Sequence, residues 1–361
     1  MTLAHAQRLT LFALLGAGPL ASGSACLVID ADADADAGPT AGSTATDPTT
    51  SDASGTSDGD PGTTEGDSGT TDDDPTITEL IPQQVLSDAG PDHAVAALAL
   101  SPAGDQVVAA LGANRVVVFS LANTSATLVH TIGAGDLFEP SAAVWGAKGF
   151  AIGTFSHCLV FDAAGSLIHE LPDRCSYLTV SADGETLVRT TTDAVATVGF
   201  ESGSVTATAA MVSPSGLGFD GDRVHVLEND GQFSIASRTL PNLDGPVSHP
   251  IDVRALSGGP LRGTLLYAEA KLWSDFAASP VVLITEGLED QKALAVSGDR
   301  RWAASLGYSA GLHVYDAATG QHLAEATLDT TSAAGLAFDA SADRLFAGSS
   351  AGVAVFTIVK Q

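Results

Sequence analysis

The sequence predicts an all-β fold that is built from repeated four-stranded antiparallel sheets. Short apolar runs rich in Val, Ala, Leu and Phe recur from residue 77 to residue 361, and polar turns rich in Gly, Ser and Asp separate them. One pattern of runs and turns returns about every 40 residues. The composition before residue 77 is different, so we expect an N-terminal export and linker region followed by one repeat domain.

The first 25 residues are typical of a secretory signal peptide. Arg8 precedes an apolar run over residues 9–20, and small residues fill most of the segment up to Ala25. The apolar run is shorter than the ~20 residues that a helix needs to cross a bilayer. We therefore expect export of the mature chain and removal of residues 1–25.

Cys26 directly follows the predicted signal and resembles the lipidated cysteine of bacterial lipoproteins. The match departs from that pattern at Gly23, where such signals usually carry Leu. The resemblance implies that a lipid on Cys26 holds the protein in a membrane, at the outer membrane or the cell surface. Cleavage after Ala25 without lipidation is the alternative, and it would give a soluble periplasmic or secreted protein.

Residues 26–76 form a predicted disordered linker. From residue 27 onward this segment holds 13 Asp and Glu and no Lys or Arg, among Thr, Ser, Gly, Ala and Pro. It cannot bury enough apolar surface to offset the entropy of ordering, and its like charges favour an extended coil. The whole chain carries 15 Lys and Arg against 43 Asp and Glu. A surface of that sign repels phosphate backbones, so we expect no nucleic-acid partner.

The repeats in residues 77–361 are recognised by a polar turn after an apolar run. Anchors for this turn are Ser101, Ser181, Ser297 and Ser341, spaced 80, 116 and 44 residues apart, which fits six intervals of about 40. The spacing predicts seven units. A repeat of this length with four short strands is typical of a β-propeller blade, so the predicted fold is a seven-bladed β-propeller.

Each unit is predicted to hold four strands in order. The first strands cover residues 96–100, 178–180, 293–296 and 335–338 in the four clearest units. The unit between residues 251 and 287 is the least regular: 265–267 and 281–284 are predicted strands, and the assignment of 271–273 is left open. The last unit ends after three strands. We expect residues 77–86 to supply its outer strand, where Pro82 is acceptable because an edge strand needs fewer backbone donors.

The repeats resemble those of WD40 and YVTN-type β-propellers. The resemblance lies in the Ser-x-Asp-Gly turn at residues 181–184 and in the Val-Tyr-Asp-x-x-Thr-Gly sequence at residues 314–320. The Gly-His and Trp-Asp pairs of WD40 repeats are missing, so the bacterial YVTN type is more similar. This resemblance implies a fold and leaves the function open.

Several motifs resemble catalytic or ligand sites but have a structural explanation. Residues 307–311 and 348–352 match Gly-x-Ser-x-Gly, yet they lie one repeat apart between strands and lack the helix of a nucleophile elbow. Residues 216–221 match a dinucleotide fingerprint, but strand residues follow, so we interpret them as a turn.

The nine His residues are dispersed and include no pair at metal-ligand spacing. We assign no catalytic, cofactor-binding or metal-binding residue and expect no cofactor.

Cys158 and Cys175 could form a disulfide, because an exported protein meets an oxidising environment. If the chain turns near residues 164–165, Cys158 faces a residue around Leu171 in the neighbouring strand rather than Cys175. Two buried free thiols are therefore an equal alternative.

We expect a monomeric, exported propeller that binds a protein or another surface ligand at the cell envelope. A propeller enzyme with a site in the central channel is one alternative, similar to lactonase-like or quinoprotein propellers. It would require His, Asp, Glu or Arg to converge on the innermost strands, which are largely apolar. A purely structural envelope module is the other alternative.

Overall fold

A computed structural model describes most of the chain from residue 75 onward. The described residues are 75–90, 92–112, 114–132, 140–214, 216–220, 222–229, 233–249, 255–256, 266–268, 271–274, 281–284, 291–307, 311–317, 319–328 and 335–361. The predicted signal peptide, Cys26 and the predicted linker up to residue 74 lie outside the described residues.

The described residues form β-strands and no helix, which confirms the predicted all-β class. The first part of the chain forms β1 (Ile77–Leu86), β2 (Val95–Leu100), β3 (Gln106–Leu111), β4 (Arg115–Ser120), β5 (Ala126–Thr131), β6 (Ala142–Trp145), β7 (Gly149–Gly153), β8 (His157–Asp162) and β9 (Leu167–Pro172). The middle part forms β10 (Leu178–Val180), β11 (Thr186–Thr190), β12 (Ala194–Gly199), β13 (Val205–Ala210), β14 (Gly216–Asp220), β15 (Arg223–Asn229), β16 (Phe233–Thr239) and β17 (Asp244–His249). The last part forms β18 (Ala255–Leu256), β19 (Leu266–Ala268), β20 (Lys271–Ser274), β21 (Val281–Ile284), β22 (Gln291–Val296), β23 (Trp302–Gly307), β24 (Gly311–Asp316), β25 (His322–Thr327), β26 (Leu336–Phe338), β27 (Arg344–Ser349) and β28 (Gly352–Lys360).

These strands form four-stranded antiparallel sheets. In six of the sheets of the described chain the strands follow one another in sequence order, from β2–β5 to β22–β25, and in a further sheet the order is β1-β28-β27-β26. Sequential pairing follows from short turns, which connect antiparallel neighbours. The strand that sequence analysis left open over 271–273 is β20, and it pairs with β19 and β21.

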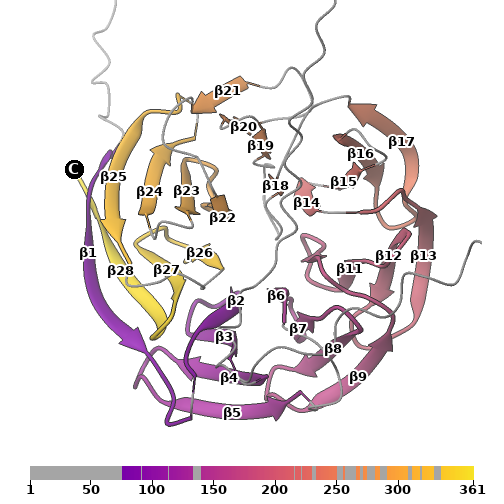
Figure 1. The fold of residues 1–361 in the computed structure, drawn as a ribbon, viewed down its shortest axis with the longest axis horizontal. Coiled ribbons are helices and arrows are strands. Elements are labelled where there is room, and N and C mark those ends of the chain that lie inside the picture. The colour runs from indigo at the N-terminus through magenta and orange to yellow at the C-terminus, as the bar shows by residue number, and fades with distance from the viewer. Residues whose placement is uncertain are drawn as a thin grey trace, which may run out of the picture. The chain divides into compact units, whose positions relative to one another are not determined.

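Innermost strands of successive sheets lie in contact. The contacts run in order from β22 to β26, β26 to β2, β2 to β6, β6 to β10, β10 to β14 and β14 to β18. Figure 1 shows the sheets side by side, and one end strand of each sheet lies toward the middle while the other lies on the outside. The inner strands are β2, β6, β10, β14, β18, β22 and β26, and the outer strands are β5, β9, β13, β17, β21, β25 and β1. Neighbouring sheets therefore cover each other's faces.

The hydrophobic core lies between neighbouring sheets. One cluster joins Phe119 of β4 to Phe346 of β27, and another joins Val116 of β4 to Phe150 and Phe161 in β7 and β8. The rings of Phe150 and Phe161 are stacked with centroids 4.8 Å apart. Because both faces of a sheet are covered, its central strands are buried almost continuously rather than at alternate residues. The outer strands alternate more and are largely exposed.

Strand β1 completes the last sheet, as the sequence predicted. It pairs with β28 from Ile77 opposite Lys360 to Leu86 opposite Val353. Pro82 lies on the edge of this sheet, with an irregularity in the register directly after it. The two ends of the described domain are thus held in one sheet.

The catalytic-looking motifs are parts of hairpins and strands. Residues 348–352 cover the end of β27, the turn after it and the first residue of β28. Residues 307 and 311 end β23 and begin β24, so a strand follows each motif where a nucleophile elbow would have a helix. The interpretation of residues 216–221 as a turn was wrong in part: Gly216 to Asp220 form β14, which pairs directly with β15.

Candidate functional site

Two ends of the sheets can be distinguished by their loops. We call the end with the hairpins between first and second strands the turn face, and the end with the hairpins between second and third strands the loop face. On the turn face, Arg344 donates to the carbonyl of Gly104 in the adjacent sheet at 3.0 Å. Ala147 likewise donates to the carbonyl of Gly184 at 3.1 Å. Equivalent turns of adjacent sheets therefore meet at the same end.

The turn face repeats one hydrogen-bonding unit. The Ser101 hydroxyl accepts the N–H five residues ahead, from Gln106, at 3.0 Å. Ser181 and Ser297 make the same bond at 2.9 Å to the N–H groups five residues after them. A side-chain oxygen that closes the turn in this way fixes where the first strand ends and the second begins.

In the last sheet the anchor predicted at Ser341 was wrong. Asp339 takes the equivalent position, because its carboxylate accepts the N–H of Arg344 at 3.1 Å and its carbonyl accepts the N–H of Ala342. Aspartate and serine both have a short side chain with an oxygen that can accept this N–H. The serine pattern of the other turns therefore does not identify Asp339. The spacing from Ser297 is thus 42 residues rather than 44.

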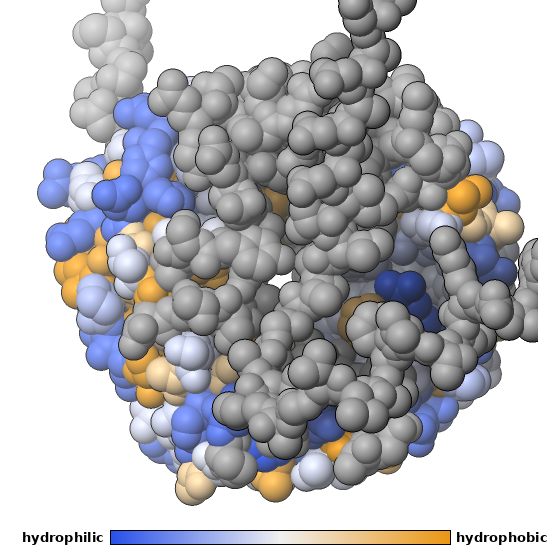
Figure 2. Space-filling model, in the orientation of Figure 1, coloured by the Kyte–Doolittle hydropathy of each residue, from blue (hydrophilic) through white to orange (hydrophobic). Residues whose placement is uncertain are grey.

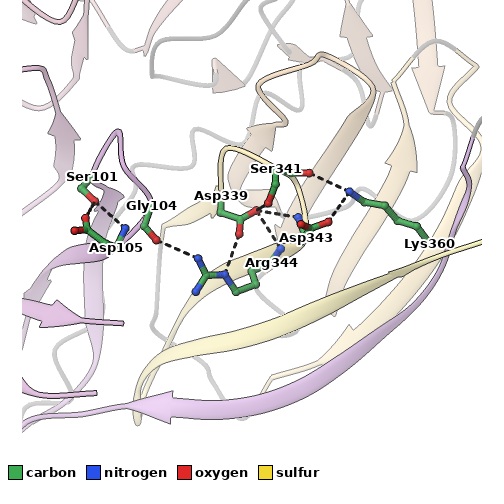
Figure 3. A network of polar contacts seen from close by, with 8 residues as sticks. All are labelled: Ser101, Gly104, Asp105, Asp339, Ser341, Asp343, Arg344 and Lys360. Atoms are coloured by element: carbon green, nitrogen blue, oxygen red, sulfur yellow. Dashed lines mark hydrogen bonds and ion pairs between the residues drawn. The ribbon is translucent and has the colours of Figure 1, made fainter. Parts of the chain in front are cut away.

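The chain enters the domain at the turn face. Thr76 and Gln361 exchange backbone hydrogen bonds at 2.8 and 2.9 Å. Beside them, the Lys360 ammonium reaches the Ser341 carbonyl at 3.0 Å and the Asp343 carboxylate at 2.9 Å. Figure 3 shows Lys360 extending toward the turn that holds Asp339 and Arg344. Any segment that precedes residue 75 is therefore joined to the turn face.

Carboxylates of the turn face are held in their charged form. A hydrogen bond from the Ser181 hydroxyl lowers the pKa of Asp183 below its ordinary value. The Lys360 ammonium lowers the pKa of Asp343 in the same direction. At neutral pH these groups accept hydrogen bonds and add negative charge to the turn face.

The loop face presents apolar and aromatic side chains beside cations. Phe155, between β7 and β8, is 42% exposed, and the guanidinium of Arg174 lies 5.1 Å from its ring centroid. Arg174 is oriented by a 2.7 Å bond to the Ser176 hydroxyl. Val212, in the connection between β13 and β14, is 53% exposed. An exposed aromatic ring under an arginine is a common element of recognition surfaces.

A buried ion pair supports the same face near the start of β4. The guanidinium of Arg115 pairs with the Asp88 carboxylate and donates to the carbonyl of Asp92. His93 lies 3.2 Å from the other oxygen of Asp88. These contacts fix the connection from β1 to β2, so this part of the loop face is built on a rigid base.

Cys158 and Cys175 are both buried, and the structure shows them as free thiols. Cys158 lies opposite Leu171, as predicted. The connection from β9 to β10 folds back, however, and brings the Cys175 thiol into hydrogen-bonding contact with Cys158. Burial raises the pKa of Cys175 well above its usual range, and Cys158 raises it further. Because its pKa is raised, the Cys175 thiol is protonated at neutral pH, and the disulfide stays a prediction.

The structure brings three potential metal ligands together on β24 and β25. His313 Nδ1 lies 3.2 Å from His322 Nε2 and 3.8 Å from Glu325 Oε2. The ring of Tyr315 packs against both imidazoles, with centroids 6.2 and 5.3 Å away. Burial lowers the pKa of His313, and the neighbouring His322 lowers it further, which favours the neutral imidazole.

This cluster was not predicted, because His313 and His322 are nine residues apart and do not have the short spacing of a usual metal-ligand pair. The signal lies in strand pairing: residues 313 and 325 face each other, as do residues 315 and 322. The other described histidines lie elsewhere, for example His225, which bonds the Ser237 hydroxyl inside its sheet, and His169, which bonds the Glu201 carbonyl.

The coloured surface in Figure 2 mixes hydrophilic and hydrophobic groups, and hydrophilic residues predominate at the upper left, where Figure 1 places β25. The part of the chain that the structure describes contains no helix that is both long and apolar enough to cross a membrane. No family model matches the chain, and no curated protein matches it. The resemblance to YVTN-type repeats therefore depends on residues 181–184 and 314–320 alone and stays a prediction.

Proposed function

We propose that this protein is an exported, lipid-anchored, seven-bladed β-propeller that binds a ligand at the cell envelope through its loop face. The proposed closed ring joins the sheet of β18–β21 to the sheet of β22–β25 and completes the row of contacts between innermost strands. The same proposal includes repeats of the YVTN type, a signal peptide over residues 1–25 and a lipid on Cys26. The sequence before residue 77 supports export and attachment.

The observation that carries the proposal is the position at which the chain enters the domain. Thr76 pairs with Gln361 on the turn face. A tether joined there leaves the opposite loop face directed away from its point of attachment. The part of the linker from Asp30 to Pro75, about 46 residues, would have a coil size of roughly 35–40 Å, which is enough to hold a domain clear of a membrane.

The composition of the loop face supports binding as the activity. Phe155 and Arg174 combine an apolar ring with a cation, and hairpin loops on a rigid sheet scaffold are suited to recognition. The partner that fits this chemistry is a protein or surface ligand with apolar and acidic groups.

Attachment is tested by intact mass and membrane fractionation of the full-length protein beside a Cys26→Ser variant. We expect a diacyl or triacyl modification on Cys26 and release of the variant into the soluble fraction. An unmodified chain that begins at or near Cys26 and is soluble would exclude the anchor.

Binding is tested with immobilised protein and a detergent extract of the envelope. A Phe155→Ser/Arg174→Ser variant changes the loop face, and Lys148→Ser changes an exposed cation on the turn face as a matched control. We expect an envelope component that is retained by the wild type and the control and lost by the loop-face variant. Equal retention by all three would exclude the loop face as the binding surface.

A further inference from the structure

The third and fourth strands of one sheet, β24 and β25, carry three nitrogen and oxygen ligands on one face. His313 belongs to β24, and His322 and Glu325 belong to β25. Their ligand atoms all lie within 4.8 Å of one another. The opposite face of the same strands is apolar, because Leu312, Val314 and Ala324 are buried in the core shared with the last sheet.

A β-bulge creates this arrangement. Residues three apart in a regular strand point to opposite faces, so His322 and Glu325 would be separated by the sheet. The register shifts between Val314 and Tyr315: Val314 lies opposite Ala324, whereas Tyr315 lies opposite His322. The extra residue in β25 returns His322 to the face that holds Glu325.

The distances match the requirements of a tetrahedral metal. Two ligands at 2.0–2.1 Å from Zn²⁺ in a tetrahedral array are roughly 3.3 Å apart. The two imidazole nitrogens are separated by 3.2 Å, and Glu325 lies on the exposed side with 71% of its side chain accessible, free to adjust from 3.8 Å. We propose that His313, His322 and Glu325 form a binding site for a divalent transition metal, with Zn²⁺ as the expected ion.

Neighbouring residues support His313 as a ligand. A side chain at Gly311 would place its Cβ 2.7 Å from His313 Nε2, so glycine leaves room for the ring in this orientation. The Tyr315 ring packs against both histidines and limits their rotation. Ligands that are positioned before the metal arrives lose less entropy on binding.

The site has the composition of an open centre rather than a closed one. Three protein ligands leave a fourth tetrahedral position for water or for a group supplied by a partner. Two imidazoles favour Zn²⁺, Ni²⁺ or Cu²⁺, whereas Mg²⁺ and Ca²⁺ prefer oxygen ligands only. Residues 27–76 hold Asp, Glu, Ser and Thr but no histidine or cysteine. Added Mg²⁺ should therefore compete for a metal held by that segment and not for a metal held by the two histidines.

The test is titration of the full-length, metal-free protein with Zn²⁺ in the presence of millimolar Mg²⁺, followed by calorimetry. A parallel titration with Co²⁺ records the visible absorption of a tetrahedral complex. His322→Gln and Glu325→Gln change ligands on an outer strand, and His169→Gln changes a histidine on the outer strand β9 as a matched control. Unfolding midpoints without metal verify that all variants are folded.

We expect one Zn²⁺ site that survives Mg²⁺, a tetrahedral Co²⁺ spectrum, and a rise in the thermal midpoint with Zn²⁺. His322→Gln should weaken binding by at least about tenfold and abolish the Co²⁺ spectrum, whereas His169→Gln should change neither. Zn²⁺ binding that is equal in the wild type and in folded His322→Gln, or that Mg²⁺ removes, would overturn the proposal.

Discussion

The carboxylate of Asp339 performs several tasks in one turn. It accepts N–H groups from Asp343 at 2.8 Å and from Arg344 at 3.1 Å, and it pairs with the Arg344 guanidinium at 2.9 Å. The same guanidinium donates to Gly104, so the carboxylate also orients a link between adjacent sheets. Only 5% of the side chain is accessible, so water cannot replace these partners.

We therefore expect Asp339→Ala to lower the free energy of unfolding by about 3 kcal/mol, because it leaves two backbone donors and a guanidinium without their acceptor. The matched control is Asp343→Ala, whose side chain is 63% accessible and pairs with Lys360. The control should cost about 1 kcal/mol or less. Urea denaturation measures both values, and equal losses would contradict the role assigned to Asp339.

Single residues also determine which turns could be predicted from the sequence. The turns at Ser101 and Ser181 were predicted correctly because serine and a following glycine mark them. In the other turns Arg300 and Ala342 occupy the position of that glycine, with φ values of 65° and 52°. Arginine and alanine do not indicate a left-handed backbone as glycine does. The turn of the last sheet was therefore assigned to Ser341 instead of Asp339.

At the scale of elements, β1 is the clearest case of a strand with two different faces. Leu80 is 5% exposed and packs in the core with residues of the last two sheets, whereas the adjacent Ile81 is 37% exposed. Leu80 and Ile81 lie on opposite faces because successive side chains of a strand point to opposite sides. Burial along the rest of β1 is not strictly alternating, because its register with β28 shifts at two places. Its outer edge is limited by Pro82, which blunts pairing with another chain.

We expect Leu80→Ala to lower the free energy of unfolding by about 2–4 kcal/mol, because it removes buried methyl groups and leaves a cavity. Ile81→Ala, one residue away on the exposed face, should cost about 1 kcal/mol or less. Chemical denaturation compares the two variants. Similar losses for both would mean that β1 does not pack in the orientation described.

The strands could be predicted where apolar runs and polar turns are clearly separated in the sequence. The proposed metal ligands could not be predicted. The pairing of β1 with β28 follows from an incomplete last repeat, which the sequence displays. The cluster of His313, His322 and Glu325 depends on a bulge in β25. No local residue pattern predicts that bulge, because it depends on how β25 pairs with β24.

At the scale of the molecule, charge is the dominant surface property. The full chain has a formal net charge of -28 at pH 7, and residues 77–361 hold 30 Asp and Glu against 14 Lys and Arg. Ion pairs at the turn face include exposed ones, such as that of Glu185 with Lys148 at 3.8 Å, and Lys148 is shared with Glu201. We therefore expect repulsion between like charges to outweigh the exposed ion pairs.

We expect the thermal midpoint at pH 7 to rise when NaCl is increased from about 0.02 to 0.5 M, because salt screens this repulsion. A zinc-free buffer separates the effect from metal binding. Scanning calorimetry measures the midpoint. A fall with added salt would mean that attractive pairs, such as that of Arg344 with Asp339, dominate the electrostatics instead.

The pairing of β1 with β28 has a mechanical consequence for the proposed anchored state. Thr76 lies at the turn face, and β1 runs from there to the loop face. A pull between an anchor joined at Thr76 and a ligand held at the loop face is directed along β1. The backbone hydrogen bonds to β28 would then bear the force together, in shear, rather than open one after another from the end. In the proposed anchored state, the strand that completes the sheet would thus also transmit load from the tether to the domain.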